Sequence, residues 1–230
     1  MAIKYTYVGH GTHSLDISGT KVLIDPFFTS NPSTNVDPNS VETDFILVSH
    51  GHFDHVEDLV PIAKRTGAKV ISNFEIVGWL QQKQGLPESQ THPQHIGGGF
   101  NHDFGRLKLT IAHHGSGLPD GSYGGNPAGL IVTAEGKKIY FACDTALFLD
   151  MQLYGEEGID LFVTPIGDNF TMGPDDALRA VKLVKPKMAV PCHYGTWPPI
   201  EQDGDAWARR VEAETETKAH ALKPGESLDL

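Results

Sequence analysis

The sequence has little of several features that assign a protein to a class at once. It has two cysteines, which allow one disulfide at most and exclude a disulfide-stabilised framework. Lys and Arg are scattered, and acidic residues exceed them to give a formal net charge of −11, so no basic surface for nucleic acid is indicated. No apolar run approaches the length of a membrane span, and the N-terminus lacks the apolar core of a signal peptide. We therefore expect a cytoplasmic protein without a membrane partner.

The length and composition favour one domain. The chain has 230 residues, 39% of them hydrophobic, which is enough for a substantial core, and no low-complexity linker or internal repeat divides it. We expect a single domain over residues 1–230, although two small domains would also fit this length. A homo-oligomer is compatible with the sequence. The unusual number is that of the histidines, of which there are twelve.

Local patterns predict two successive halves of similar build. Runs of β-branched, aromatic and apolar residues predict strands at 3–8, 14–17, 21–24, 44–49, 68–72, 100–104, 106–112, 128–133, 138–142, 160–165, 187–191 and 218–222. Apolar residues at helical spacing predict helices at 56–66, 74–84, 146–154, 174–185 and 205–214. Each half thus has hairpins followed by strand–helix units. Two sheets packed face to face, with helices outside, would bury both sets of strands, so we expect a mixed α/β (α+β) fold.

One short segment gathers four potential metal ligands. It reads SHGHFDHVEDL and follows the apolar run 44–49. His50 and His52 are two residues apart and project to the same side of an extended backbone. Asp54 and His55 follow where the chain turns into a helix. Neutral imidazole suits zinc and other borderline metals, and carboxylate suits harder ones. A solvated histidine-rich turn is the alternative, but four ligand-type residues between a buried strand and a helix favour a metal site.

The segment His50-Gly-His-Phe-Asp-His55 resembles the signature of the metallo-β-lactamase-fold hydrolases. Further segments resemble the uncharacterised branch related to ascorbate-6-phosphate lactonase. They are KVLIDP after Gly9-His10, HHGSGLPDGSYGGNPAGLIV, FACDT, TPIGDNFTMGPDDA and VPCHYGTWPPI. The resemblance covers nearly the whole chain. It implies the metallo-β-lactamase fold, a four-layer αββα sandwich, which agrees with the layers inferred above.

The resemblance also implies a site for two divalent metal ions. Zinc is expected first, with manganese, iron or nickel as alternatives. One ion would be bound by His50, His52 and His114. The other would be bound by Asp54, His55 and His193, with Asp144 bridging the two.

Two positions depart from the family pattern. Gly115 stands where the family usually has Ser, and Cys143 replaces the glycine that usually precedes the bridging aspartate. His113 competes with His114 as the third histidine, but the family block, in which small residues follow the histidine, selects His114. The cysteines Cys143 and Cys192 each sit beside a proposed ligand on a strand, so we expect both to be buried and unligated.

For three sites outside this ligand set, the sequence allows two alternative roles each. Asp25 ends a strand and is a candidate to orient a metal-bound histidine, since such histidines usually donate their second ring N–H to a carboxylate or carbonyl; a turn residue is the alternative. His10 is expected either to support the ligands or to face the substrate. The loop residues Asp168, Asn169, Thr171 and Met172 either shape the pocket rim or have a purely structural role.

The expected reaction is hydrolysis by a metal-bound hydroxide, without a Ser-His-Asp nucleophile. Asp54 and Asp144 would be the catalytic residues that orient the hydroxide and accept its proton. The substrate is expected to be a small molecule with a lactone or other ester bond, or a phosphoester. The alternatives are a phosphodiesterase acting on nucleotides and a non-catalytic metal- or ligand-binding protein of the same fold. A redox role like that of the flavo-di-iron proteins is disfavoured, because no flavin-binding second domain is present.

Overall fold

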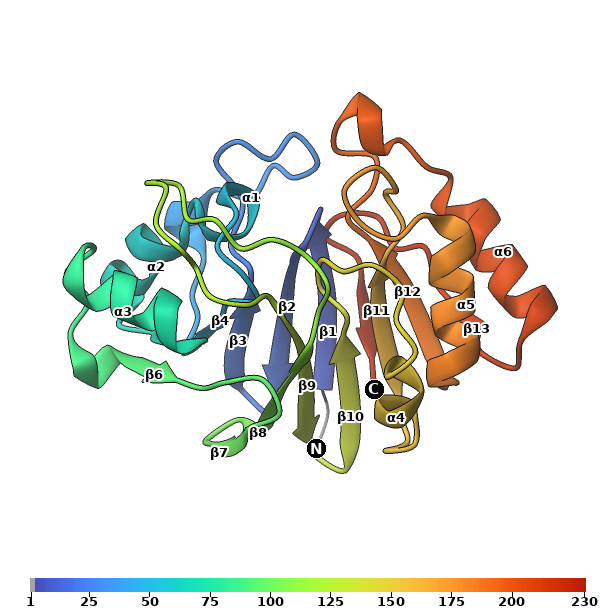
Figure 1. Cartoon of the computed structure of the whole chain (residues 1–230), viewed down its shortest axis with the longest axis horizontal. Helices are drawn as coiled ribbons and strands as arrows, with labels where there is room; N and C mark the ends of the chain where they lie inside the picture. Colours follow the sequence, from blue (N-terminus) through green and yellow to red (C-terminus); the bar gives the residue numbers. More distant parts are fainter. Residues whose placement is uncertain (1–2) are drawn as a thin grey trace.

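The computed structural model describes residues 3–230, which form two seven-stranded sheets packed face to face with helices on both outer faces (Figure 1). The predicted four-layer αββα fold is therefore confirmed. None of the helices in this part of the chain combines the length and the apolar composition that crossing a membrane would require.

The first sheet has the strand order β14-β1-β2-β3-β4-β5-β6. Neighbouring strands from β14 through β1 and β2 to β3 pair antiparallel, and those from β3 through β4 and β5 to β6 pair parallel. Its strands are β1 (Ile3–Gly9), β2 (Thr12–Ile17), β3 (Thr20–Ile24), β4 (Phe45–Leu47), β5 (Lys69–Ser72), β6 (Thr91–Pro93) and β14 (Ser227–Asp229). Helices α1 (Phe53–Val56), α2 (Leu59–Thr66) and α3 (Phe74–Gln82) cover its outer face (Figure 1).

The second sheet has the order β13-β12-β11-β10-β9-β8-β7. Its first four strands in the chain pair antiparallel, and β10 to β13 are parallel. The strands are β7 (Gly99–His102), β8 (Gly105–Ile111), β9 (Ala128–Ala134), β10 (Lys137–Phe141), β11 (Leu161–Pro165), β12 (Met188–Cys192) and β13 (Lys218–Ala219). Helices α4 (Met151–Gly155), α5 (Pro174–Val184) and α6 (Gly204–Glu214) pack on its outer face.

Alternating side chains of the central strands divide between the inner and outer layers. In β3, Val22 and Ile24 belong to the core between the sheets, whereas Leu23 packs under the helices. In β11, Val163 lies between the sheets and Phe162 faces the helices. Successive strand residues point to opposite faces, so a strand covered on both sides needs apolar residues at consecutive positions. This explains the continuous apolar runs of the sequence.

Three predicted elements differ from the structure. The helix expected at 56–66 is observed only from Leu59 as α2, and the short helix α1 precedes it. Between them, the Asp58 carboxylate accepts the backbone N–H groups of Phe28 (2.7 Å) and Thr29 (3.0 Å). The helix expected at 146–154 begins only at Met151, and the last predicted strand shortens to Lys218–Ala219. The edge strands β6 and β14 were not predicted. Edge strands are short and half exposed, so their apolar signal is weak.

Candidate metal centre

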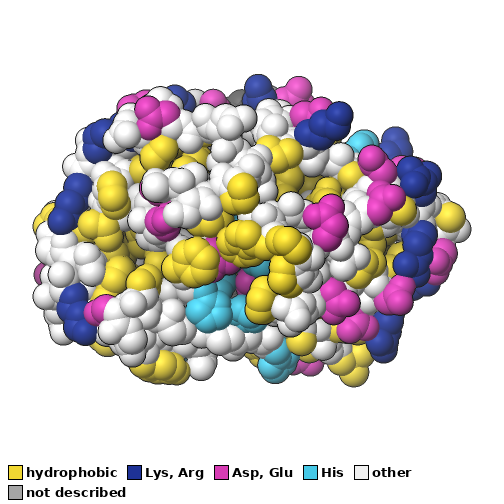
Figure 2. Space-filling view, turned by 90° about the horizontal axis from the view of Figure 1, so that it is seen from above, with side chains coloured by type: hydrophobic (Ala, Val, Ile, Leu, Met, Phe, Trp, Pro, Cys, Tyr) yellow, Lys and Arg dark blue, Asp and Glu magenta, His cyan; other side chains and the backbone are white. Residues whose placement is uncertain are grey.

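The seven predicted ligands come together at one edge of the sandwich. His50 and His52 follow β4, and Asp54 and His55 lie in α1. The other three also follow strands: His114 follows β8, Asp144 follows β10 and His193 follows β12. Figure 2 shows histidines (cyan) gathered at the centre of this face, beside hydrophobic side chains (yellow). Four separate segments therefore deliver side chains to one place, as expected for loops at strand ends.

The first group of ligands consists of His50, His52 and His114, whose ligand atoms lie within 4.8 Å of one another. His50 is buried, while the other two are partly exposed. His50 Nε2 lies 3.0 Å from His52 Nδ1. The other ring nitrogen of His50, Nδ1, lies 2.9 Å from Ser49 Oγ. Ser49 therefore fixes the ring so that Nε2 faces the group.

The second group consists of Asp54, His55, His193 and His10, again within 4.8 Å of one another and all buried. Nε2 of His55 and Nε2 of His193 are each 3.7 Å from Asp54 Oδ2. His55 Nδ1 lies 2.9 Å from an oxygen of Asp25. This contact leaves Nε2 of His55 free to face the group.

Asp144 lies between the two groups. Its Oδ2 is 3.4 Å from His114 Nε2 and 3.9 Å from His50 Nε2 in the first group. The same oxygen is 3.5 Å from His55 Nε2 and 3.1 Å from His193 Nε2 in the second group. One carboxylate oxygen thus faces four imidazole nitrogens, which is the position that a carboxylate shared by two ions needs.

The donor atoms fit metal binding in a further respect. His55 Nε2 and both ring nitrogens of His193 are buried without a hydrogen-bond partner in the described chain. An unpartnered buried polar atom costs on the order of 1–3 kcal/mol. A cation would satisfy the nitrogens that point into the site. Imidazole and carboxylate donors in this number suit zinc and other first-row transition metals.

The carboxylates dominate the electrostatics of the centre. Burial opposes ionisation of Asp144, but the charges of His193 and His55 hold its pKa well below the usual range. Burial likewise opposes protonation of His193, but Asp144 and Asp54 raise its pKa to about 9. At His50, burial and the neighbouring His55 outweigh Asp144 and lower the pKa. Burial also opposes protonation of His55, but Asp144, Asp25 and Asp54 raise its pKa well above the usual value. Protons on His55 and His193 therefore compensate the carboxylates in the metal-free chain, a role that bound cations would take over.

Asp25 makes the contacts expected of a residue that orients ligands. It accepts the backbone N–H of Ser49 (2.7 Å) and the Ser49 hydroxyl (2.5 Å), in addition to its contact with His55. The Ser49 hydroxyl is also next to His50. Asp25 therefore connects to one histidine of each group, and the turn that it occupies after β3 serves the site.

His10 is buried beneath the centre and does not face the cavity. Its Nε2 is 2.9 Å from Asp54 Oδ2, and its Nδ1 is 2.8 Å from Thr196 Oγ1. Burial and the neighbouring His193 lower its pKa to about 4, so the ring is neutral. A neutral ring that donates from Nε2 accepts the Thr196 hydroxyl at Nδ1. Of the two roles suggested by the sequence, the structure supports the orientation of Asp54.

The two neighbouring histidines have different surroundings. His113 is exposed, packs its ring against Phe148 (5.0 Å between centroids) and belongs to no ligand group of the described chain. His114 belongs to the first group. At the next position, a Cβ on Gly115 would lie 3.3 Å from His52 Nε2. The glycine that departs from the family pattern thus leaves room for a ligand ring.

The cysteines take no part in the ligand groups of residues 3–230. Cys192 is buried in the core between the sheets, as predicted. Cys143 is partly exposed, so the prediction of full burial was wrong for it. Burial raises the pKa of both thiols well above the usual value, which makes them poor thiolate ligands.

A cavity of about 750 Å³ opens onto the centre. Five of the proposed ligands line it, namely His52, Asp54, His114, Asp144 and His193. The rest of its wall is formed by Phe53, Gly117, Pro119, Phe170, Trp197 and Pro199. The 168–172 loop therefore contributes Phe170, not the polar residues or Met172 that the sequence suggested. A large aromatic residue between the polar residues Asn169 and Thr171 was the signal in the sequence that could have identified it.

Known proteins are similar to this chain in both sequence and fold. The model of the beta-lactamase superfamily domain matches residues 20–194. A UPF0173 metal-dependent hydrolase of Thermus thermophilus is 47% identical over 228 residues, which are 99% of each chain. One of Heliobacterium modesticaldum is 48% identical over 236 residues, covering 99% of this chain and 98% of that one.

Solved structures agree. The metallo hydrolase Igni18 of Ignicoccus hospitalis has a TM-score of 0.89 and 34% identity, and the match covers 100% of this chain and 99% of that one. An isothiocyanate hydrolase from Delia radicum gut bacteria shares the fold, with a TM-score of 0.75, 22% identity and 98% of each chain covered. This chain therefore belongs to the beta-lactamase superfamily and, within it, to the UPF0173 metal-dependent hydrolases.

Proposed function

We propose that the chain hydrolyses an ester or lactone bond of a small molecule at a centre for two divalent ions, with zinc as the preferred metal. The observation that carries this proposal is the position of Asp144, one oxygen of which faces histidines of both ligand groups. In the proposal, His50, His52 and His114 bind the first ion. Asp54, His55 and His193 would bind the second, and Asp144 would be shared between the two.

When bound, two such ions would lower the pKa of water to about 7 and polarise the substrate carbonyl. The protein residues have separate tasks around this chemistry. Asp54 lines the cavity and is fixed at Oδ2 by His10, so it can orient a water molecule and accept its proton. Asp144 holds the two histidine groups in one geometry. A nucleophilic side chain is not needed in this scheme.

The reaction class can be tested with the metal-loaded protein and a panel of substrates that contains uncharged lactones, uncharged aryl esters and anionic phosphodiesters. We expect turnover of lactones or esters that a chelator abolishes and zinc or manganese restores. Asp144→Asn should lower the turnover and the metal content together. Turnover confined to phosphodiesters would contradict the bond type. Metal-loaded protein without any hydrolysis would favour the non-catalytic alternative.

A further inference from the structure

The wall of the cavity beside the proposed ligands is apolar. Phe53 and Phe170 line it with 52% and 54% of their surface exposed. The Phe53 ring is fixed edge-on against Phe27 at 5.8 Å between centroids, and it lies 6.1 Å from the ring of Trp197. Phe53 is also held in the chain between the proposed ligands His52 and Asp54. The Phe53 part of the wall is thus fixed relative to the proposed metal ligands.

Leaving these rings in water is unfavourable. Full burial of a phenylalanine side chain contributes about 1.5–3 kcal/mol relative to its exposure. Exposed apolar side chains that gather in a concave site, next to convergent polar groups, are typical of ligand-binding surfaces. At this cavity, the convergent polar groups are the metal ligands, and the proline residues Pro119 and Pro199 continue the apolar wall.

The cavity provides no cationic side chain for an anionic substrate. None of the residues that line it is Lys or Arg, and its polar lining consists of proposed metal ligands. On this face of the molecule, Lys and Arg (dark blue) lie toward the margins of the view (Figure 2). A phosphate or carboxylate distant from the reacting bond would therefore lose its water without gaining a charged partner, which is costly.

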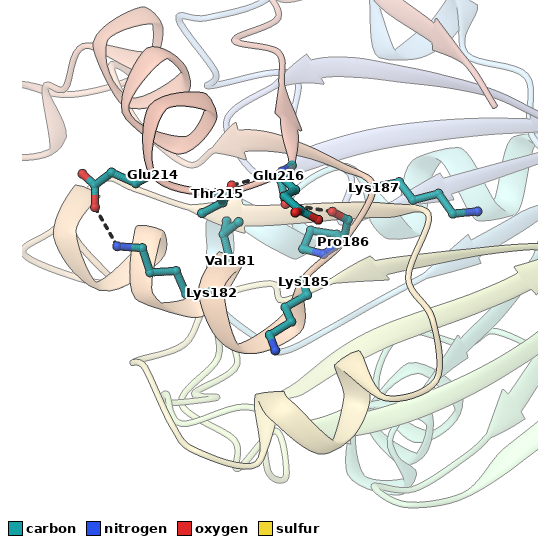
Figure 3. A pocket seen from close by; sticks show the side chains of 9 residues that line it. Val181, Lys182, Lys185, Pro186, Lys187, Glu214, Thr215 and Glu216 are labelled. Carbon is teal, nitrogen blue, oxygen red and sulfur yellow. Dashed lines mark hydrogen bonds and ion pairs between the residues drawn. The ribbon is translucent and has the colours of Figure 1, made fainter.

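Lysines do gather elsewhere, in a pocket of about 560 Å³ lined by Lys182, Lys185 and Lys187 (Figure 3). Two of them are already paired: Lys182 with Glu214 at 2.6 Å and Lys187 with Asp160 at 2.8 Å. This pocket lies where α5 ends and β12 begins, whereas His193 follows the other end of β12. Its charges therefore serve no group bound at the metal centre.

We propose that the substrate is uncharged away from its scissile bond and carries an apolar group that packs against Phe53, Phe170 and Trp197. This inference rests on the proposed function, since it places the scissile ester or lactone carbonyl toward the ligand groups. Phe53 and Phe170 are then specificity-determining residues, and the apolar wall positions the substrate without charge recognition.

The first test compares two aryl esters that differ in one group, para-tolyl acetate and para-acetoxybenzoate. The carboxylate makes the second ester slightly more reactive toward hydroxide, so a preference for the tolyl ester cannot come from intrinsic reactivity. We expect kcat/KM to favour the tolyl ester by about tenfold or more. Phe53→Ala and Phe170→Ala should each reduce this preference. Phe100→Ala should leave it unchanged, because Phe100 is similarly exposed (49%) but lies on β7, away from the cavity.

The second test measures binding without turnover. The uncharged fluorophore N-phenyl-naphthylamine should bind the metal-loaded protein, and its affinity should fall about tenfold in Phe53→Ala and in Phe170→Ala but not in Phe100→Ala. Selective binding without hydrolysis of either ester would contradict the proposed function and support the apolar site. A kinetic preference for the carboxylate ester, or binding unaffected by both cavity substitutions, would overturn the inference even if hydrolysis is observed.

Discussion

The two ligand groups differ in how firmly their side chains are held. In the second group, His10 contacts Asp54, Asp25 contacts His55, and all members are buried. In the first group, His52 and His114 are partly exposed and line the cavity. The second group is thus the more enclosed, with side chains fixing Asp54 and His55, whereas in the first group Ser49 fixes His50 and the other two rings line the cavity. One oxygen of Asp144 faces histidines of both groups.

The largest effect is expected from removal of the shared carboxylate. Asp144→Ala should leave the chain with almost no bound zinc, because both groups lose a ligand and the charge that compensates their cations. Turnover should fall by more than about 10⁴-fold, beyond the usual range of a general acid–base effect. Metal analysis beside kcat/KM checks this. Retention of two ions by the variant would show that Asp144 does not bridge.

Loss of one histidine should separate the groups. His114→Ala is expected to lose the first ion and keep the second, since His55, His193 and Asp54 are untouched. His113→Ala is the matched control and should keep both ions, because that ring packs on Phe148 instead. The metal content per chain of the two variants decides the matter. Metal loss in the His113 variant alone would reverse the assignment of the third histidine.

Neutralising Asp54 should affect the rate more than the metal. Asp54→Asn keeps the size of the side chain and one oxygen but removes the charge that accepts a proton. We expect turnover to fall about 10²–10⁴-fold, with normal circular dichroism and near-normal occupancy of the first site. Full turnover in this variant would exclude the proposed role of the carboxylate.

The smallest effect is expected from the support of the second group. His10→Ala removes the N–H that fixes Asp54, so zinc affinity at the second site should fall about 10–100-fold while the first site is unchanged. His10→Gln retains a donor and should recover part of the affinity. Competition titration with a chromophoric chelator measures both sites. An equal loss at the two sites would mean that His10 acts on the fold instead.

The sequence was informative where the signal is local. The residues from His50 to His55 lie within six positions of one another, and the apolar runs predicted both sheets. The distant ligands His114, Asp144 and His193 follow different strands, so residue pattern alone could not bring them together and the family resemblance was needed. The limits of the domain, expected to span residues 1–230, stay a prediction.

Other features depended on tertiary contacts. The apolar spacing at 146–154 predicted a helix, but the backbone N–H of Ala146 donates to His113 O (3.1 Å) and that of Met172 donates to Thr145 O (3.0 Å). These bonds hold the segment beside the metal centre in a non-helical form. The contact of His10 with Asp54 likewise needs the end of β1 beside α1. No local pattern encodes such pairings.

The most direct test of the proposed two-ion centre is a zinc titration of wild-type protein from which a chelator has removed all metal. Calorimetry and thermal melting monitor the titration. The account predicts two ions bound per chain. It also predicts a rise in melting temperature, since a ligand at 100 times its Kd stabilises the native state by about 2.7 kcal/mol for each site. Binding of a single ion with no further heat, or a melting curve that zinc leaves unchanged, would contradict it.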